Sequence, residues 1–120
     1  MAYDEVTAER VRRVLRRRKY SETRLMGGLC FMVGGSMCCS ISGRGGLLIR
    51  VDAGGYESAL TEPHVAPMKM GHRTMRGFVR VAPEGYRTDQ ALERWVARGL
   101  EAAAACSPRS GTRARRKKST

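Results

Sequence analysis

The chain has 120 residues, which is the length of one ordinary domain, so two packed domains are not expected. Hydrophobic residues make up 42% and charged residues 28%, the composition of a soluble globular protein. No apolar run approaches the roughly 20 residues that a membrane span needs. Residues 1–5 lack the apolar stretch of a secretory signal, so we expect a cytoplasmic protein without membrane contact.

The positive charge is unevenly distributed. The formal net charge is +12, from 23 Lys+Arg and 11 Asp+Glu. Six basic residues without any acidic neighbour fall in residues 107–120: Arg109, Arg113, Arg115, Arg116, Lys117 and Lys118. This segment has no large apolar residue, so we expect a folded domain over residues 1–106 and a disordered basic tail over residues 107–120. Such charge favours contact with nucleic acid or acidic surfaces and does not define a fold.

Residues 4–19 predict an amphipathic helix with one apolar and one basic side. The apolar side is expected to contain Tyr3, Val6, Thr7, Val11, Val14 and Leu15. The basic side is expected to contain Arg12, Arg13, Arg16 and Lys19. A basic helix face is either a docking surface or an ordinary solvated face, and the solvated face is the commoner case.

An antiparallel meander follows the helix. The expected strands are residues 29–33, 36–42 and 47–51. Turns at Gly34-Gly35 and at residues 43–46 connect them, because glycine tolerates the positive φ angles of a tight hairpin. Residues 23–26 precede the meander and are expected to lie against the sheet edge.

The second half of the chain predicts two helices with a strand between them. A short helix over residues 55–60 stops near Pro63, and residues 61–74 read as a loop with one short strand near residues 67–70. A clearer strand covers residues 77–81. The last helix begins at Thr88 or Asp89, and Gly99 within its apolar stripe indicates close packing on the sheet. The whole pattern predicts an α+β fold, a two-layer sandwich with an antiparallel sheet.

The four cysteines are Cys30, Cys38, Cys39 and Cys106, and they form no CxxC pair. His64 and His72 are too far from them in sequence to match a zinc-site spacing. Cys38 and Cys39 are neighbours in a strand, so we expect their side chains on opposite faces and no disulfide framework. Reduced cysteines that fill the core are therefore expected, with a thiol-redox or catalytic role for Cys30, Cys38 or Cys39 as the alternative.

No catalytic pattern emerges from the sequence. None of the glycine pairs matches a phosphate-binding loop, and the carboxylates are scattered over helix faces and turns. We therefore expect a protein that is not an enzyme, with no catalytic residue, no cofactor and no metal.

Two candidate binding surfaces remain. Met68, Met70 and Met75 are the candidates for partner binding, because methionine-rich surfaces adapt to partners, although core filling is the commoner role. The candidates for nonspecific contact with DNA or RNA lie on the first helix and in the tail: Arg12, Arg16, Arg113, Arg115, Arg116, Lys117 and Lys118. Such phosphate contacts would be blind to sequence and sensitive to salt.

Several stretches resemble the N-terminal domain of the TfoX/Sxy family of competence regulators. They are residues 1–5, 27–33, 37–39, 73–79 and 95–100. Met26 stands where the family usually has an aromatic residue, and Gly34-Gly35 where it often has Asn-Gly or Asp-Gly. The resemblance implies an α-β(3)-α-β(2)-α order and no known catalytic residue. It also implies a stand-alone copy of the domain, because full-length competence regulators carry a second domain that this sequence does not contain.

From these observations we expect a non-enzymatic protein that acts by protein–protein contact in transcription regulation. Nonspecific nucleic-acid binding is the alternative function. An exposed sheet edge would also permit a homodimer.

Overall fold

Helices and strands alternate in blocks along the chain in the computed structural model, which describes residues 4–25, 27–43, 45–70 and 72–105. The elements in chain order are α1 (Glu5–Leu15), β1 (Ser21–Leu25), β2 (Gly28–Val33), β3 (Ser36–Ile41), β4 (Leu47–Arg50), α2 (Ala53–Leu60), β5 (Val65–Met70), β6 (Arg73–Val81), the 3-10 helix η1 (Pro83–Tyr86) and α3 (Asp89–Ala105). The strands form one antiparallel six-stranded sheet in the order β1-β2-β3-β4-β6-β5.

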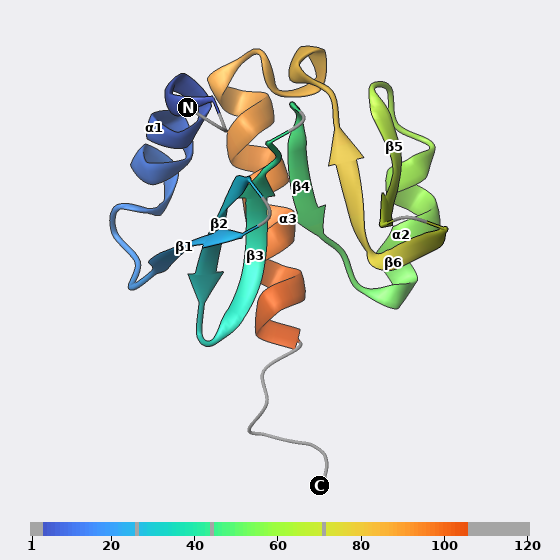
Figure 1. The fold of residues 1–120 in the computed structure, drawn as a ribbon, viewed down its shortest axis with the longest axis horizontal. Helices are drawn as coiled ribbons and strands as arrows, with labels where there is room; N and C mark the ends of the chain where they lie inside the picture. Colours follow the sequence, from blue (N-terminus) through green and yellow to red (C-terminus); the bar gives the residue numbers. More distant parts are fainter. Residues whose placement is uncertain (1–3, 26, 44, 71, 106–120) are drawn as a thin grey trace, which may run out of the picture.

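The helices form the second layer of the molecule. In Figure 1, α3 runs behind the central strands, and it contacts β3 and β4. Helix α1 packs beside α3, and α2 packs on the β5–β6 end of the sheet. The core between the layers includes Trp95 of α3, Phe31 of β2 and Ile49 of β4, all of which are fully buried. The fold is therefore α+β, a two-layer sandwich with an antiparallel sheet, as predicted.

Gly99 explains how closely the two layers approach. A Cβ atom built at this position would overlap the carbonyl oxygen of Cys38 on β3. Only glycine lets α3 lie directly on the strand backbone at this point. The close packing that was expected from a glycine inside an apolar stripe is confirmed.

The first half of the chain has one strand more than the expected order. Residues 21–25 form β1, which pairs with β2 along its whole length, from Ser21 opposite Met32 to Leu25 opposite Gly28. The segment expected to lie against the sheet edge is thus itself the edge strand. The two-residue turn is confirmed, with Gly34 at φ 61° and Gly35 at φ 84°.

Helix α1 is shorter than the predicted residues 4–19. It begins after Asp4, whose carboxylate accepts a hydrogen bond from the backbone N–H of Val6 at 3.1 Å, and it ends at Leu15. The four residues that follow are all basic and exposed, so a longer helix would place like charges together and bury nothing. Val6 was expected on the apolar side but is 69% exposed, because the buried side of the helix passes through Thr7, Ala8, Val11 and Leu15.

Residues 61–74 were expected to be a loop with one short strand near residues 67–70; that strand is present as part of β5, but the prediction of a loop for the rest was wrong. This region contains β5 and the start of β6, which form a hairpin, with Val65 opposite Val81 and Met70 opposite Arg73. A register shift between Pro67 and Lys69 interrupts the alternation that would mark a strand in the sequence. Pro67 fits because β5 is an outer strand, where a missing N–H costs no ladder bond on the open side.

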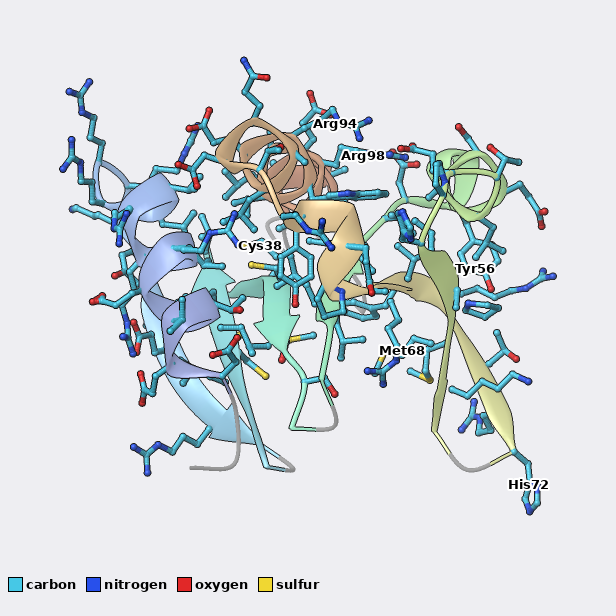
Figure 2. All side chains as sticks on the ribbon, turned by 90° about the horizontal axis from the view of Figure 1, so that it is seen from above. Cys38, Tyr56, Met68, His72, Arg94 and Arg98 are labelled. Atoms are coloured by element: carbon cyan, nitrogen blue, oxygen red, sulfur yellow. The ribbon has the colours of Figure 1, made fainter. Side chains whose placement is uncertain are left out.

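A salt-bridged corner joins the end of α2 to α3. Glu62 pairs with Arg94 at 3.1 Å and with Arg98, and both arginines also lie over the ring of Trp95. Figure 2 shows Arg94 and Arg98 on α3, with Arg98 near the neighbouring helix α2. No helix in the described ranges is long and apolar enough to cross a membrane. The predicted tail, residues 107–120, lies outside the described residues.

Candidate functional site

The strongest candidate site is a cationic surface at the end of α1. The side chains of Arg13, Arg16, Arg17, Arg18 and Lys19 are all exposed, and so is that of Arg24 on the neighbouring strand β1. We call these residues the α1–β1 basic surface. None of them forms an ion pair with a carboxylate in the described part of the chain. Their charge is therefore available to an anionic partner.

Arg12 binds the carboxylates that lie near this surface, so they do not pair with its basic residues. Its guanidinium donates to Glu22 of β1 through two hydrogen bonds, of 2.7 and 3.0 Å, and lies 3.8 Å from Glu5 and 3.6 Å from Glu9. The acidic side chains nearby are thus gathered around one arginine. The hydrogen bonds from Arg12 also lower the pKa of Glu22, because they stabilise its charged form.

The two first-helix residues predicted to contact nucleic acid therefore differ in their surroundings. Arg16 lies in the α1–β1 basic surface, whereas Arg12 is held by carboxylates and is the less available of the two. Sequence reasoning missed Arg17, Arg18 and Arg24, because it considered only one face of a longer helix. The run of four basic residues at 16–19 was the signal that could have indicated Arg17 and Arg18, whereas Arg24 joins them only through the position of β1. The tail candidates Arg113, Arg115, Arg116, Lys117 and Lys118 lie outside the described residues.

Strand β1 gives this surface an open backbone edge. It is the outer strand of the sheet on this side, and its described backbone hydrogen bonds go only to β2. The side chains of Ser21, Glu22, Thr23 and Arg24 are not part of the buried core. Neither proline nor a bulge interrupts its pairing. An extended segment of another chain can add to such an edge through backbone hydrogen bonds.

The opposite edge of the sheet differs from β1. Strand β5 carries Pro67 and Lys69, two residue types that protect sheet edges from pairing. Met68 and Met75 are half-buried and lie outside the core cluster, whereas the side chain of Met70 is outside the described residues. Figure 2 shows His72 at the far tip of the β5–β6 hairpin. The predicted methionine surface is thus only partly exposed.

Cys38 and Cys39 correct an expectation from the sequence. They were expected on opposite faces of a strand, but both side chains are fully buried with their Sγ atoms 3.8 Å apart. The reason is a β-bulge, since Phe31 pairs with Cys39 and Met32 pairs with Met37, which leaves Cys38 as an extra residue on β3. A bulge re-aims a side chain, and here it brings Cys38 against Gly99 of α3. Burial of Cys30, Cys38 and Cys39 as free thiols is confirmed.

Other chemical groupings are sparse in the described ranges. These ranges contain no group of three or more His, Cys, Asp or Glu side chains that could hold a metal ion. The structure does not bring His72 to the cysteines, since the hairpin tip is remote from Cys38 in Figure 2. His64 is exposed at the start of β5.

The fold and this surface define a small α+β domain whose most distinctive exposed feature is cationic. The model of the TfoX N-terminal domain matches residues 14–103, which is three quarters of the chain, and the chain belongs to this family. The resemblance seen in the sequence is thereby confirmed. Comparisons with curated proteins and with solved structures gave no match.

Proposed function

We propose that this TfoX N-terminal domain protein is a non-enzymatic interaction module that binds a protein partner along the β1 edge. The observation that carries the proposal is the combination of an open edge strand with a flanking cationic surface that has no acidic partner of its own. The family of competence regulators to which the sequence is similar supports a role in transcription regulation.

The chemistry of this surface indicates what the partner presents. Backbone hydrogen bonds along β1 require an extended segment, because only an extended chain aligns its N–H and C=O groups with an edge strand. Arg16, Arg17 and Arg18 favour acidic side chains in the part of that segment that passes the end of α1. An extended acidic segment of a regulatory protein fits both requirements.

Site-specific photo-crosslinking in cells tests this proposal. A photoreactive residue at Thr23 on β1 should form a covalent adduct with a distinct protein, and one at Ala66 on the opposite edge should not. The triple variant Arg16→Glu/Arg17→Glu/Arg18→Glu should remove the adduct. Its matched control is Lys69→Glu/Arg73→Glu/Arg76→Glu on the exposed β5–β6 hairpin, which makes the same charge change and should keep the adduct. Equal crosslinking from both edges contradicts the proposal.

Nonspecific nucleic-acid binding is the second candidate function, and the exposed run at residues 16–19 favours it. The full chain should then bind duplex DNA of any sequence, with about a 100-fold loss of affinity between 50 and 200 mM salt for four phosphate contacts. Neutralising Arg113, Arg115, Arg116, Lys117 and Lys118 to Gln separates the tail from the folded surface. No binding at 50 mM salt by the unmodified chain excludes this function.

A further inference from the structure

The charge pattern of the open β1 edge is complementary to a second copy of the same strand. Strand β1 pairs with β2 along its whole length without a bulge, and its central residue Thr23 is flanked by Glu22 and Arg24. A second β1 strand that runs in the opposite direction presents the same two charges in reverse order. Each charge of one strand then lies opposite a charge of the other sign.

The ladder between β1 and β2 determines which backbone groups of β1 remain open. Leu25 pairs with Gly28 across only two intervening residues, so these two partners exchange their own N–H and C=O hydrogen bonds. Because bonded and non-bonded pairs alternate along an antiparallel ladder, Thr23 also directs its N–H and C=O groups to β2. The N–H and C=O groups of Glu22 and Arg24 therefore face the open side, where a further strand can bond to them.

The side chains of Glu22 and Arg24 lie on the face of the sheet that the helices cover. Glu22 lies opposite Phe31 and Arg24 opposite Leu29, and both of these β2 residues are buried in the core. Arg24 is exposed and forms no ion pair with a described carboxylate. Glu22 accepts two hydrogen bonds from Arg12, and a carboxylate has about four acceptor sites. Each residue can therefore take one more partner of opposite charge.

One antiparallel register satisfies both the backbone and the charges. When Thr23 lies opposite Thr23 of the other copy, each Glu22 lies opposite an Arg24, and each of these pairs exchanges backbone hydrogen bonds. A register centred on Glu22 would oppose two carboxylates, and one centred on Arg24 would oppose two guanidinium groups, which is unfavourable. A slip by one residue would set Glu22 opposite Thr23, whose backbone groups are already bonded to β2.

We propose that β1 binds β1 of a second copy of the chain in this register, so that two sheets join across a twofold axis at Thr23. The axis is perpendicular to the joined sheet, so the helices of both copies cover the same face. On the proposed function, on which this step alone rests, the dimer conceals the edge that an extended acidic segment of another protein would use.

Disulfide trapping tests the register on the full-length chain. The starting protein carries Cys30→Ser and Cys106→Ser, because Cys30 lies opposite Thr23 on β2 and would compete for a new thiol there. Thr23→Cys should form a disulfide-linked dimer under mild oxidation, since Cα atoms of an opposed pair without backbone bonds are about 4.5 Å apart. Ser21→Cys, also exposed and on the same face of β1, is the matched control. Its two copies would be about 14 Å apart in this register and should remain unlinked.

Charge reversal tests the same pairing between chains. Glu22→Arg and Arg24→Glu should each leave the chain monomeric in sedimentation, because like charges then lie opposite each other. An equimolar mixture of the two variants should form dimers again, since every charge at the interface then faces the opposite charge. Mixing cannot repair the lost Arg12–Glu22 pair within one chain, so recovery separates the interface from folding. Lys69→Glu on the exposed opposite edge is the control and should leave dimer formation unchanged.

Salt distinguishes this dimer from contact with nucleic acid. Each chain carries a net charge of +12, so two copies repel each other at long range. Screening of this repulsion should strengthen the dimer between about 50 and 500 mM salt, whereas binding to a polyanion weakens over the same range.

Two results would overturn the proposed dimer. One is that Thr23→Cys and Ser21→Cys link equally or not at all, and the other is that the mixed charge variants stay monomeric. These measurements use the purified chain alone, so they are independent of the crosslinking in cells. Absence of a cellular adduct with a distinct protein at Thr23 would contradict the proposed partner and leave the dimer standing.

Discussion

At the scale of single residues, Gly99 and Arg12 each perform a task that no other side chain at their position could take over. Gly99 removes the side chain where α3 touches the β3 backbone. Arg12 holds Glu22 by a two-point hydrogen bond and so ties α1 to β1. Gly99 is needed because it has no side chain, whereas Arg12 is needed because its forked guanidinium group can donate two hydrogen bonds to one carboxylate.

We expect Gly99→Ala to destabilise the fold by about 1–3 kcal/mol, as overpacked cores do. Alanine favours a helix by about 1 kcal/mol over glycine, but the new methyl group overlaps backbone that cannot rotate away. Urea unfolding measures the change. Gly54→Ala in α2 is the control, because its Cβ would make only an ordinary 3.7 Å contact with Asp52, and it should be neutral or stabilising.

The pair Arg12–Glu22 predicts a pH-dependent contribution to stability. Because the pKa of Glu22 is lowered in the folded state, its contribution is present above the unfolded-state pKa of glutamate and is lost as pH falls through the lowered value. Glu22→Gln should therefore cost up to about 1 kcal/mol at pH 7, and the difference from the unmodified protein should vanish in acid. Thermal unfolding from pH 7 to pH 3 measures this difference.

The control for that experiment is Glu57→Gln. Glu57 is exposed on α2 and forms no ion pair with the described residues. A pH-independent cost for Glu22→Gln would contradict the argument.

At the scale of elements, α1 is the helix least tied to the sheet. Its main packing partner is α3, and its connection to β1 is the Arg12–Glu22 pair. Its start depends on Asp4, which accepts hydrogen bonds from the Val6 N–H and, at 2.7 Å, from the Thr7 hydroxyl. The buried residues Ala8, Val11 and Leu15 nevertheless make α1 part of the core, so the cationic surface is held to the helix layer rather than to the sheet.

We expect Asp4→Ala to weaken α1 locally, by about 1 kcal/mol. Amide hydrogen exchange should show faster exchange in α1 and unchanged protection in α3 and β4. Equal loss of protection in all three elements would mean that α1 unfolds only with the whole domain.

The elements also show which parts of the fold could be predicted from sequence. The Gly34-Gly35 turn and the capped start of α3 follow local rules, and both are confirmed; the Thr88 hydroxyl accepts from the Ala91 N–H at 3.1 Å. The hairpin of β5 and β6 was predicted only in part, as short strands near residues 67–70 and 77–81, because the register shift beside Pro67 interrupts the alternation that marks a strand.

The candidate site was predictable to a smaller extent. The basic residues were visible in the sequence, but their availability depends on where Arg12 finds its carboxylates, one of them on β1. The contact between the Cys38 and Cys39 thiols depends on a bulge, which a strand pattern does not reveal.

At the scale of the whole molecule, the two edges of the sheet are unequal. Strand β1 is open, whereas β5 carries Pro67 and Lys69. Any pairing between copies of the chain should therefore use β1 and stop at a dimer.

Replacing Pro67 and Lys69 on β5 should allow assemblies larger than a dimer to form. Sedimentation of the double variant Pro67→Val/Lys69→Val at high concentration should show species larger than a dimer, because both edges can then pair. The unmodified chain should show only monomer or dimer at the same concentration. Larger species of the unmodified chain would contradict the assignment of β5 as the protected edge.

The difference between the β1 and β5 edges also determines how many partner strands one molecule would bind under the proposed function. Under the proposed function, a sheet that accepts a strand at one edge only would bind one partner strand per molecule, and no further strand could add. Saturation at one partner per molecule then requires no gate and no energy source. Pro67, which lies on the opposite edge from the basic surface, would then limit the number of partner strands that one molecule can bind.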